Sequence, residues 1–494
     1  MGNRRNRQND RDRRHAGSVN CGPALESESP PLPPTLQLND ENAVTTDVCD
    51  SPDESPVKHG TVMRRNFCWT FVGNVIYAAC QWGMLVAIAK LGTTAMVGRF
   101  GIALAVTAPV IMFTNLQLGT IQATDARLQY LFGDYLGLRL ISTVLAMLAI
   151  AGVSECSGYG GPVTAVVLAV GLAKSFEAVG DVVYGLFTQR EQLHYVAKSM
   201  IARGVLSLIA IVVGLRLTGS VLSAAVALAV VNALVLLTYD LRNGAFVLTR
   251  SGRDTTKCIA WFPSPRWDRR RLIRMTVMTL PMGAVALLSS LNLNIPRYFI
   301  ERFSGEHALG IFVAMAYMQV AGTTVVRALG QSVCSRLATY YADFNIAAYR
   351  NLMLKLLGAG VLLSVAGVLI AWKAGPQLLT VIYKPEYAEY SETFILLMMG
   401  SAGIYLAMFL GYGLTAARQL NVQTTLMLIA SVATTIMCAV LVPHGGINGA
   451  AMALIIGNFV WVAGSLLVLL RVFHTDKKAR LESANQTGGG SYES

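Results

Sequence analysis

The stretch Leu172-Ala-Lys-Ser-Phe-Glu-Ala-Val-Gly-Asp-Val-Val-Tyr-Gly-Leu-Phe-Thr-Gln-Arg190 places three charged residues inside an apolar segment that begins at Gly161. Lys174, Glu177 and Asp181 are spaced i, i+3 and i+7, so a helix carries all three within roughly 60° of one another on a single face. Charged side chains in a membrane span rarely face lipid and usually point to a bundle interior or a wet cavity. This face is therefore a candidate functional site.

The composition is that of a polytopic membrane protein. Hydrophobic residues make up 54% of the 494 positions, charged residues only 14%, and the mean hydropathy is +0.50. The net charge of +12 would suggest a nucleic-acid partner in a soluble chain, but most Lys and Arg here lie between apolar segments, where they orient membrane helices. We expect no nucleic-acid partner, no cofactor, no metal and no disulfide framework.

Twelve apolar segments follow Asn66, each of about 18–25 residues, the length that a helix needs to cross the hydrocarbon. They predict an all-α integral membrane protein. The segments cover about residues 67–89, 98–116, 136–154, 162–187, 196–216, 219–239, 276–297, 308–330, 352–373, 392–414, 420–441 and 446–470.

The distribution of basic residues predicts the orientation. From residue 62 onward, 25 Lys and Arg fall in loops and tails on the side of the N-terminus, and 7 fall on the opposite side. The positive-inside rule then places both termini in the cytoplasm. Cys156 is the one cysteine expected in an outside loop.

The same segments predict the domain organisation. The expected parts are a disordered cytoplasmic tail (1–62), an N-terminal six-helix bundle (63–240), a basic cytoplasmic linker (241–275), a C-terminal six-helix bundle (276–472) and a second cytoplasmic tail (473–494). Trp267 beside the linker arginines suits either a contact with anionic lipid or a solvated connection.

Three short motifs recur across the linker. Tyr184-Gly-Leu-x-x-x-Arg190 returns as Tyr412-Gly-Leu-x-x-x-Arg418, and Ile201-Ala202 as Ile429-Ala430, both 228 positions later; Ala224-Ala-x-Ala-Leu-x-x-x-Asn232 returns 226 positions later. Because each half has an even number of helices, the repeats are parallel. Transporters of this kind place the substrate between the halves and rock one bundle against the other.

The chain also resembles a known family. Asn66-Phe-Cys-Trp-Thr-Phe-Val-Gly-Asn-Val-Ile-Tyr-Ala-Ala-Cys-Gln-Trp-Gly-Met-Leu85, Met96-Val-Gly-Arg-Phe-Gly101, Thr124-Asp-Ala-Arg127 and Gly133-Asp-Tyr-Leu-Gly-Leu-Arg139 resemble the polysaccharide-export type of oligosaccharide flippase. These belong to the multidrug/oligosaccharidyl-lipid/polysaccharide exporter (MOP) superfamily, which also contains the multidrug-and-toxin (MATE) exporters. The resemblance covers about residues 62–472.

The resemblance implies a MATE-like, V-shaped pair of six-helix bundles in the bacterial cytoplasmic membrane. Such a flippase moves a polyprenyl-diphosphate-linked oligosaccharide from the cytoplasmic to the outer leaflet. It is coupled to an ion gradient, of H⁺ or Na⁺, rather than to ATP. Its partners would be the lipid-linked oligosaccharide, membrane lipids and polysaccharide-assembly proteins.

Polar residues in the first and seventh helices are candidates for a sugar-binding cavity. Asn74, Tyr77 and Gln81 share a face at i, i+3 and i+7, and the seventh helix carries Asn292 and Asn294. Amides and hydroxyls on these faces either bind sugar hydroxyls or form hydrogen bonds with a neighbouring helix.

Two arginines are candidates for diphosphate binding. Arg203 and Arg327 fall one to two turns inside the expected cytoplasmic ends of the fifth and eighth helices. They either extend to the membrane interface or bind a diphosphate, whose dense negative charge suits the guanidinium fork.

The charged face of the fourth helix has two interpretations. Glu177 takes and releases a proton during the transport cycle, with Lys174 and Asp181 as its charged neighbours, or Lys174 and Glu177 form a structural salt bridge. Asp181 is closer to the cytoplasmic end and is expected to be a solvated or capping residue.

Other functions are open at this stage. A cation-coupled multidrug or toxin exporter has the same fold, and fold does not settle substrate. A peptidoglycan-precursor flippase also fits the composition. A membrane polysaccharide polymerase or ligase would need a large outside loop with catalytic groups, whereas the outside connections here are short, so we expect a non-enzymatic protein. The chain has no Gly-x-x-x-x-Gly-Lys-Ser/Thr motif for an ATP-driven pump.

Overall fold

The structure is a computed structural model that describes residues 56–125, 128–251, 256, 258–259, 262–343 and 345–488. The predicted tail falls outside these residues as far as position 55. The first helix begins at Pro56, upstream of the expected start at 67, and crosses the predicted tail boundary at 62.

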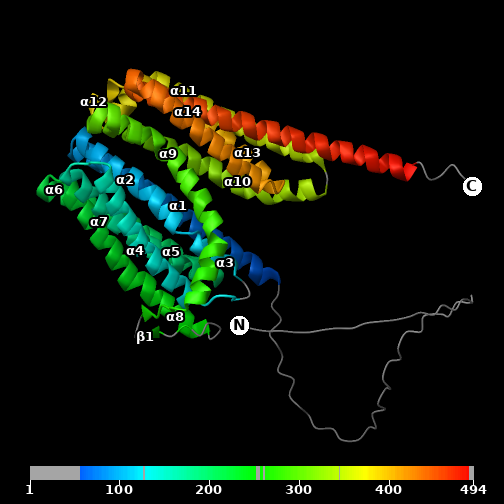
Figure 1. Cartoon of the computed structure of the whole chain (residues 1–494), viewed down its shortest axis with the longest axis horizontal. Helices are drawn as coiled ribbons and strands as arrows, with labels where there is room; N and C mark the ends of the chain where they lie inside the picture. Colours follow the sequence, from blue (N-terminus) through cyan, green and yellow to red (C-terminus); the bar gives the residue numbers. More distant parts are fainter. Residues whose placement is uncertain are drawn as a thin grey trace, which may run out of the picture. The chain divides into compact units, whose positions relative to one another are not determined.

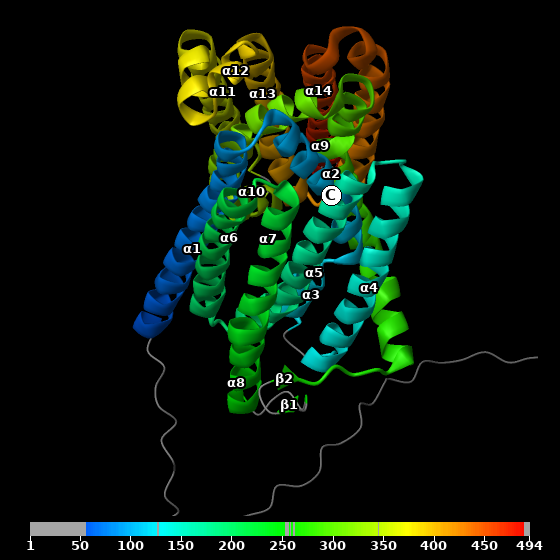
Figure 2. The ribbon, with the colours of Figure 1, turned by 90° about the vertical axis from the view of Figure 1, so that its left-hand side faces the viewer.

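The described residues are almost entirely helical (Figures 1 and 2). The N-terminal half contains α1 (Pro56–Leu91), α2 (Thr94–Thr114), α3 (Leu118–Thr124), α4 (Phe132–Cys156), α5 (Gly161–Gln189), α6 (Leu193–Thr218), α7 (Val221–Val235), a π-helical turn η1 (Leu236–Asp240) and α8 (Leu241–Ser251). The C-terminal half contains α9 (Arg269–Tyr317), α10 (Gln319–Ala342), α11 (Ile346–Ile382), α12 (Pro385–Ala388), α13 (Ser391–Ala416) and α14 (Leu420–Gly488).

Within the described residues, ten helical segments are long and apolar enough to cross a membrane. The two longest, Arg269–Ala342 and Val422–Arg471, each contain a glycine with non-helical backbone, Gly305 and Gly446. Both glycines lie where the sequence predicts a boundary between two helices. The chain is a multi-pass, all-α membrane protein, and the count of twelve spans stays a prediction.

The turns between helices repeat across the two halves. Glu191 and Arg418 both have positive φ after α5 and α13, and Gly219 and Gly446 both have positive φ after α6 and in α14. Each pair is 227 positions apart, one residue away from the offsets of 228 and 226 between the sequence motifs. The architecture therefore repeats, but the matching motif residues are not in register with the repeated turns.

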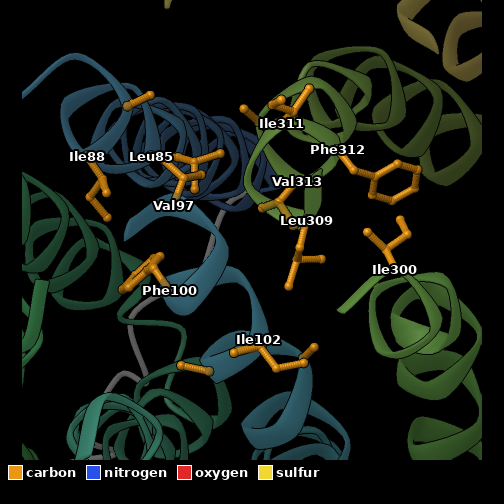
Figure 3. Packing of buried hydrophobic residues seen from close by; sticks show 14 of the residues in the cluster. Leu85, Ile88, Val97, Phe100, Ile102, Ile300, Leu309, Ile311, Phe312 and Val313 are labelled. Carbon is orange, nitrogen blue, oxygen red and sulfur yellow. The ribbon is translucent and has the colours of Figure 1, made fainter. Parts of the chain in front are cut away.

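Contacts between the halves gather where the turns at Gly92, Gly305 and Lys384 meet, which we call the junction end. Leu85, Ile88, Val97, Phe100 and Ile102 of α1 and α2 belong to the same buried cluster as Ile300, Leu309, Ile311, Phe312 and Val313 of α9 (Figure 3). The helix backbones are close, because a Cβ on Gly98 would overlap the carbonyl oxygen of Glu306, and a Cβ on Gly310 that of Thr94.

The connection between α8 and α9 is shorter than the predicted linker, 241–275. Helix α8 occupies 241–251 and α9 already begins at Arg269, where the Asp268 side chain accepts hydrogen bonds from the Arg270 and Arg271 amides. Between them, β1 (Cys258–Ile259) and β2 (Phe262–Pro263) pair antiparallel. This region lies beside α8 and the start of α4 (Figure 2), and we call it the strap end.

The described residues between α8 and α9, which we call the strap, form hydrogen bonds with the N-terminal half. The Arg266 amide donates to the Gly133 carbonyl at 2.9 Å, and the Gly133 amide donates to Thr256 Oγ1 at 3.1 Å. Buried Asp134 forms an ion pair with Arg271 at 3.6 Å and lies 4.0 Å from Arg266. The connection is thus packed on the protein along these residues rather than fully solvated.

Candidate functional site

The charged face of α5 forms the centre of a polar network in the N-terminal half. Gly160 and Pro162 start α5, since proline is well tolerated in the first helical turn. The helix then places Lys174 and Glu177 together, with Nζ 2.7 Å from Oε2, and both side chains are half-buried. The salt bridge that was one of the two sequence interpretations is therefore formed.

Tyr77 connects α1 to this pair. Its hydroxyl donates to Glu177 Oε1 at 2.6 Å, so a predicted cavity residue lies in the charged network. The other two residues of that predicted set do not join it. Asn74 is exposed and donates to the Thr70 carbonyl at 2.8 Å within its own helix, and Gln81 is half-buried.

A second ion pair lies deeper, between α6 and η1. Arg203 Nη2 donates to Asp240 Oδ2 at 2.6 Å, and their side chains are 2% and 0% exposed. Ser199 donates to Asp240 Oδ1 at 2.5 Å and shares a hydrogen bond with Tyr184, whose ring lies 5.7 Å from the guanidinium. Extension of Arg203 to the interface, one of its two sequence interpretations, is therefore wrong, because a buried carboxylate holds the guanidinium inside the bundle.

Asp240 is a site residue that the sequence analysis missed, because it falls just outside the predicted helix 219–239. In the structure the helix continues through η1, a π-helical turn of five residues that ends at Asp240. Such wider turns recur at functional sites. The sequence feature that could have revealed this residue is its acidic side chain one position beyond the predicted apolar span.

The third ion pair joins α4 and α5. Arg139, fully buried, donates through Nη2 to Asp181 Oδ2 at 3.2 Å and through Nη1 to Asn115 Oδ1 at 2.6 Å. Asp181 itself is 48% exposed. Of its two expected roles, the exposed side chain agrees with a solvated residue. A capping role is wrong, because α5 continues for two more turns, to Gln189.

The two predicted amides of α9 are both buried, and one of them bonds within its own helix. Asn294 is buried, donates to the Ser290 carbonyl at 2.8 Å and accepts from Arg297 at 3.1 Å. Asn292 is also buried, and its Oδ1 has no hydrogen-bond partner among the described residues. The structure therefore does not bring these amides into the hydrogen-bond network of Tyr77.

Arg327 differs from Arg203 in its surroundings. It lies on α10 with an exposed side chain that has no ion pair among the described residues. Its backbone carbonyl accepts from the Tyr412 hydroxyl at 3.4 Å. Of the two predicted diphosphate ligands, Arg327 therefore has the guanidinium that is accessible.

Polar contacts close the junction end. Arg99 Nε pairs with Glu306 Oε2 at 2.7 Å, and Thr94 forms a hydrogen bond of 2.7 Å with His307. Lys384 donates to the Gly92 carbonyl. These contacts all join the N-terminal half to the C-terminal half.

An aromatic pair adds to this closure. Trp82 donates to the Tyr383 hydroxyl at 3.4 Å, and Tyr383 donates to the Ala314 carbonyl at 2.7 Å. Burial raises the pKa of Tyr383 to about 12, against the opposite effect of the bond from Trp82, so the phenol stays neutral at physiological pH.

Within the described part of the chain, no three His, Cys, Asp or Glu side chains are arranged so that they could hold a metal ion. Each of the three ion pairs joins one basic and one acidic side chain. Arg139 Nε and Arg203 Nε and Nη1 have no further hydrogen-bond partner among the described residues. Chemically, the arrangement can hold, exchange or relay charge.

Comparisons with known proteins agree with this architecture. The chain is 27% identical over 420 residues to the capsular polysaccharide biosynthesis protein CapF of Staphylococcus aureus, an alignment that covers 83% of this chain and all of that protein. No family model matches the sequence.

Two solved structures give the fold. A multidrug resistance MATE family transporter of the MOP superfamily, in an inward-facing conformation, superposes with a TM-score of 0.61 at 15% identity, covering 83% of this chain and 99% of that one. The lipid II flippase MurJ, in an inward closed conformation, gives 0.64 at 10% identity, covering 82% and 92%. An outward-facing MATE structure gives 0.55.

These neighbours are transporters and flippases rather than enzymes. Their fold, together with the similarity to the staphylococcal capsule protein, confirms the resemblance that the sequence motifs indicated. The chain has the all-helical membrane-transporter fold of the MOP superfamily and resembles its polysaccharide-export type.

Proposed function

We propose that this protein is a flippase that moves a polyprenyl-diphosphate-linked oligosaccharide from the cytoplasmic to the outer leaflet of the bacterial cytoplasmic membrane. Its role would be in surface polysaccharide biosynthesis. The observation that carries the proposal is similarity to a capsular polysaccharide biosynthesis protein over that protein's whole length. A fold shared with a lipid flippase supports it.

In this proposal the two bundles, 63–240 and 276–472, rock about the junction end, and the substrate lies between them. The contacts between the halves at the junction end favour a state that loads from the strap end. The TM-score is also higher for the inward-facing MATE structure, 0.61, than for the outward-facing one, 0.55. Arg327 would contact the diphosphate, because its guanidinium is exposed and has no acidic partner among the described residues. Asn74, Gln81, Asn292 and Asn294 remain proposed sugar contacts.

Lys174, Glu177 and Asp181 are the proposed coupling residues, for H⁺ or Na⁺. The two carboxylates are held by basic side chains on or beside α5, which would release them only if the bundle rearranged.

Export of a cationic drug is the second candidate, supported by the MATE neighbours. It is disfavoured because a cation needs an unpaired carboxylate, and Glu177, Asp181 and Asp240 are each paired.

Deletion of the gene is expected to make diphosphate-linked oligosaccharide accumulate on the cytoplasmic face of the membrane. The lipid-linked intermediates would be extracted and sized, with leaflet position assayed by accessibility to a membrane-impermeant oxidant. In the complemented strain, Arg327→Ala should restore export less than Arg327→Lys does, because lysine keeps the positive charge. Normal export in the deletion strain, without a redundant transporter, would remove the proposal.

The proposed orientation, with both termini in the cytoplasm, predicts thiol accessibility in intact cells. Cys156 ends α4 and is exposed, so an impermeant maleimide should modify it. Cys21 and Cys49, which lie outside the described residues, should be protected until the cells are lysed. Efficient labelling of Cys21 in intact cells would reverse the orientation.

A further inference from the structure

A small cavity lies in the C-terminal half, between α13 and α14. Its volume is about 190 Å³, and it is lined by Ala407, Met408, Gly411, Tyr412, Thr415, Gln423 and Trp461. Pockets for drug-sized ligands measure about 300–1,000 Å³. This one has room for a single small ring.

One residue of the cavity corresponds in the fold to a residue of the charged site in the N-terminal half. At the repeat distance of 227 defined by the turns, Lys174, Glu177 and Asp181 correspond to Ser401, Ile404 and Met408. Met408 lines the cavity. Where the N-terminal half carries the ion-paired Asp181, the C-terminal half therefore has an apolar residue beside an uncharged cavity.

Two hydrogen-bond donors that belong to lining residues have no acceptor in the described part of the chain. Trp461 Nε1 is buried and has no partner among the described residues. Gln423 accepts from Thr415 through Oε1 at 3.2 Å, while its Nε2 lies over Gly411, 3.0 Å from where a Cβ would be, and has no hydrogen bond among the same residues. Buried donors nearly always have partners, so the buried Trp461 indole indicates a ligand that carries oxygen acceptors. The half-buried Gln423 amide offers such a ligand a second donor.

The lining also defines the chemistry of that ligand. Every lining residue is uncharged, so the cavity suits neither a cation nor the diphosphate itself. Tyr412 and Trp461 supply aromatic side chains, and the amide and hydroxyls supply hydrogen bonds. Apolar rings combined with a few polar groups suit a sugar ring, which has apolar C–H faces and hydroxyls around its edge.

The cavity adjoins the exposed arginine. Tyr412 lines it and donates to the backbone carbonyl of Arg327, and Gly330, one turn further along α10, packs directly under the Tyr412 ring. A sugar in the cavity would thus lie near the residue whose guanidinium is proposed to contact the diphosphate.

We infer that this cavity of α13 and α14 is a subsite for one sugar ring of the oligosaccharide, with Trp461 and Gln423 as its hydrogen-bond donors. The inference rests on the proposed flippase function and specifies which half holds the sugar.

Tryptophan fluorescence tests the subsite directly. The full-length protein, in nanodiscs free of sugar detergents, would be titrated with methyl glycosides of hexoses and of N-acetylhexosamines. At least one glycoside should give a saturable change in the wild type and in Trp372→Phe, a matched control because Trp372 lies exposed on α11. Trp461→Phe should lose the change, and Gln423→Leu should weaken binding about tenfold, the effect of roughly one to two hydrogen bonds.

The outcomes separate the subsite from the proposed function. An absence of saturable change with every glycoside would mean that the cavity holds water only. An unchanged response in Trp461→Phe would mean that the glycoside binds elsewhere. Either result would overturn the subsite. If deletion causes accumulation of lipid-linked oligosaccharide but normally expressed Trp461→Phe and Gln423→Leu restore full export, the subsite is wrong and the flippase function stands. If deletion leaves export normal, the function itself fails.

Discussion

Replacement of Asp240 by alanine is expected to destabilise the folded protein by about 3–5 kcal/mol, the usual cost of leaving a buried charge without its partner. Arg203 would lose the carboxylate that now lies 2.6 Å away, in a site where its side chain is 2% exposed. Its Nε and Nη1 atoms already have no partner among the described residues, so they provide no substitute. Thermal unfolding of the purified protein in nanodiscs measures the loss.

Two further variants make this prediction specific. The double change Arg203→Met with Asp240→Leu should recover most of the stability, because it removes both charges and fills the space with apolar atoms. Glu306→Ala is the matched control. Glu306 lies 2.7 Å from Arg99, but more than a quarter of each of these two side chains is exposed. The loss of folding stability should therefore be only about 0–1 kcal/mol. Wild-type stability in Asp240→Ala would contradict the importance of the buried pair.

Replacement of Glu177 by glutamine is expected to slow gradient-driven export by about tenfold or more. Lys174 would lose the carboxylate that lies 2.7 Å from its Nζ inside the membrane, and a free-energy change of about 1.4 kcal/mol already equals tenfold in rate. Export would be followed by the appearance of lipid-linked oligosaccharide in the outer leaflet. Tyr77→Phe is the control, since it removes one hydrogen bond to Glu177 and leaves the charge pair intact.

A second change distinguishes the two roles of Glu177. If the pair is structural, the addition of Lys174→Met to Glu177→Gln should recover export, because no unpaired buried charge remains. If Glu177 carries the coupling proton, both variants should stay inactive while remaining folded in the membrane. Wild-type export in Glu177→Gln would exclude the coupling role.

Much of the fold could be predicted because the membrane limits what a chain can do. An apolar segment in lipid must satisfy its backbone internally and therefore becomes a helix, so segment length alone predicts where α4, α5 and α6 lie. The ends of helices were less predictable. Helix α9 begins at Arg269 rather than 276, because Asp268 caps it and the strap holds the preceding residues on α4.

The ion pairs of the candidate site were likewise predictable only in part. The Lys174–Glu177 pair was predictable, because residues three apart on one helix are always neighbours. The pairs of Arg203 with Asp240 and of Arg139 with Asp181 were not, because they join residues 37 and 42 positions apart on different helices.

The sequence by itself therefore determined the class of fold and the charged face of α5, since both follow from local periodicity and from the solvent that surrounds the chain. Only the tertiary structure decided which charges neutralise one another and which arginine stays exposed. The physical reason is that a guanidinium inside a bilayer must find a carboxylate or reach water, and the helix packing fixes which of these is within its reach. Arg203 meets Asp240 because η1 carries that carboxylate into the bundle, whereas Arg327 remains exposed on α10.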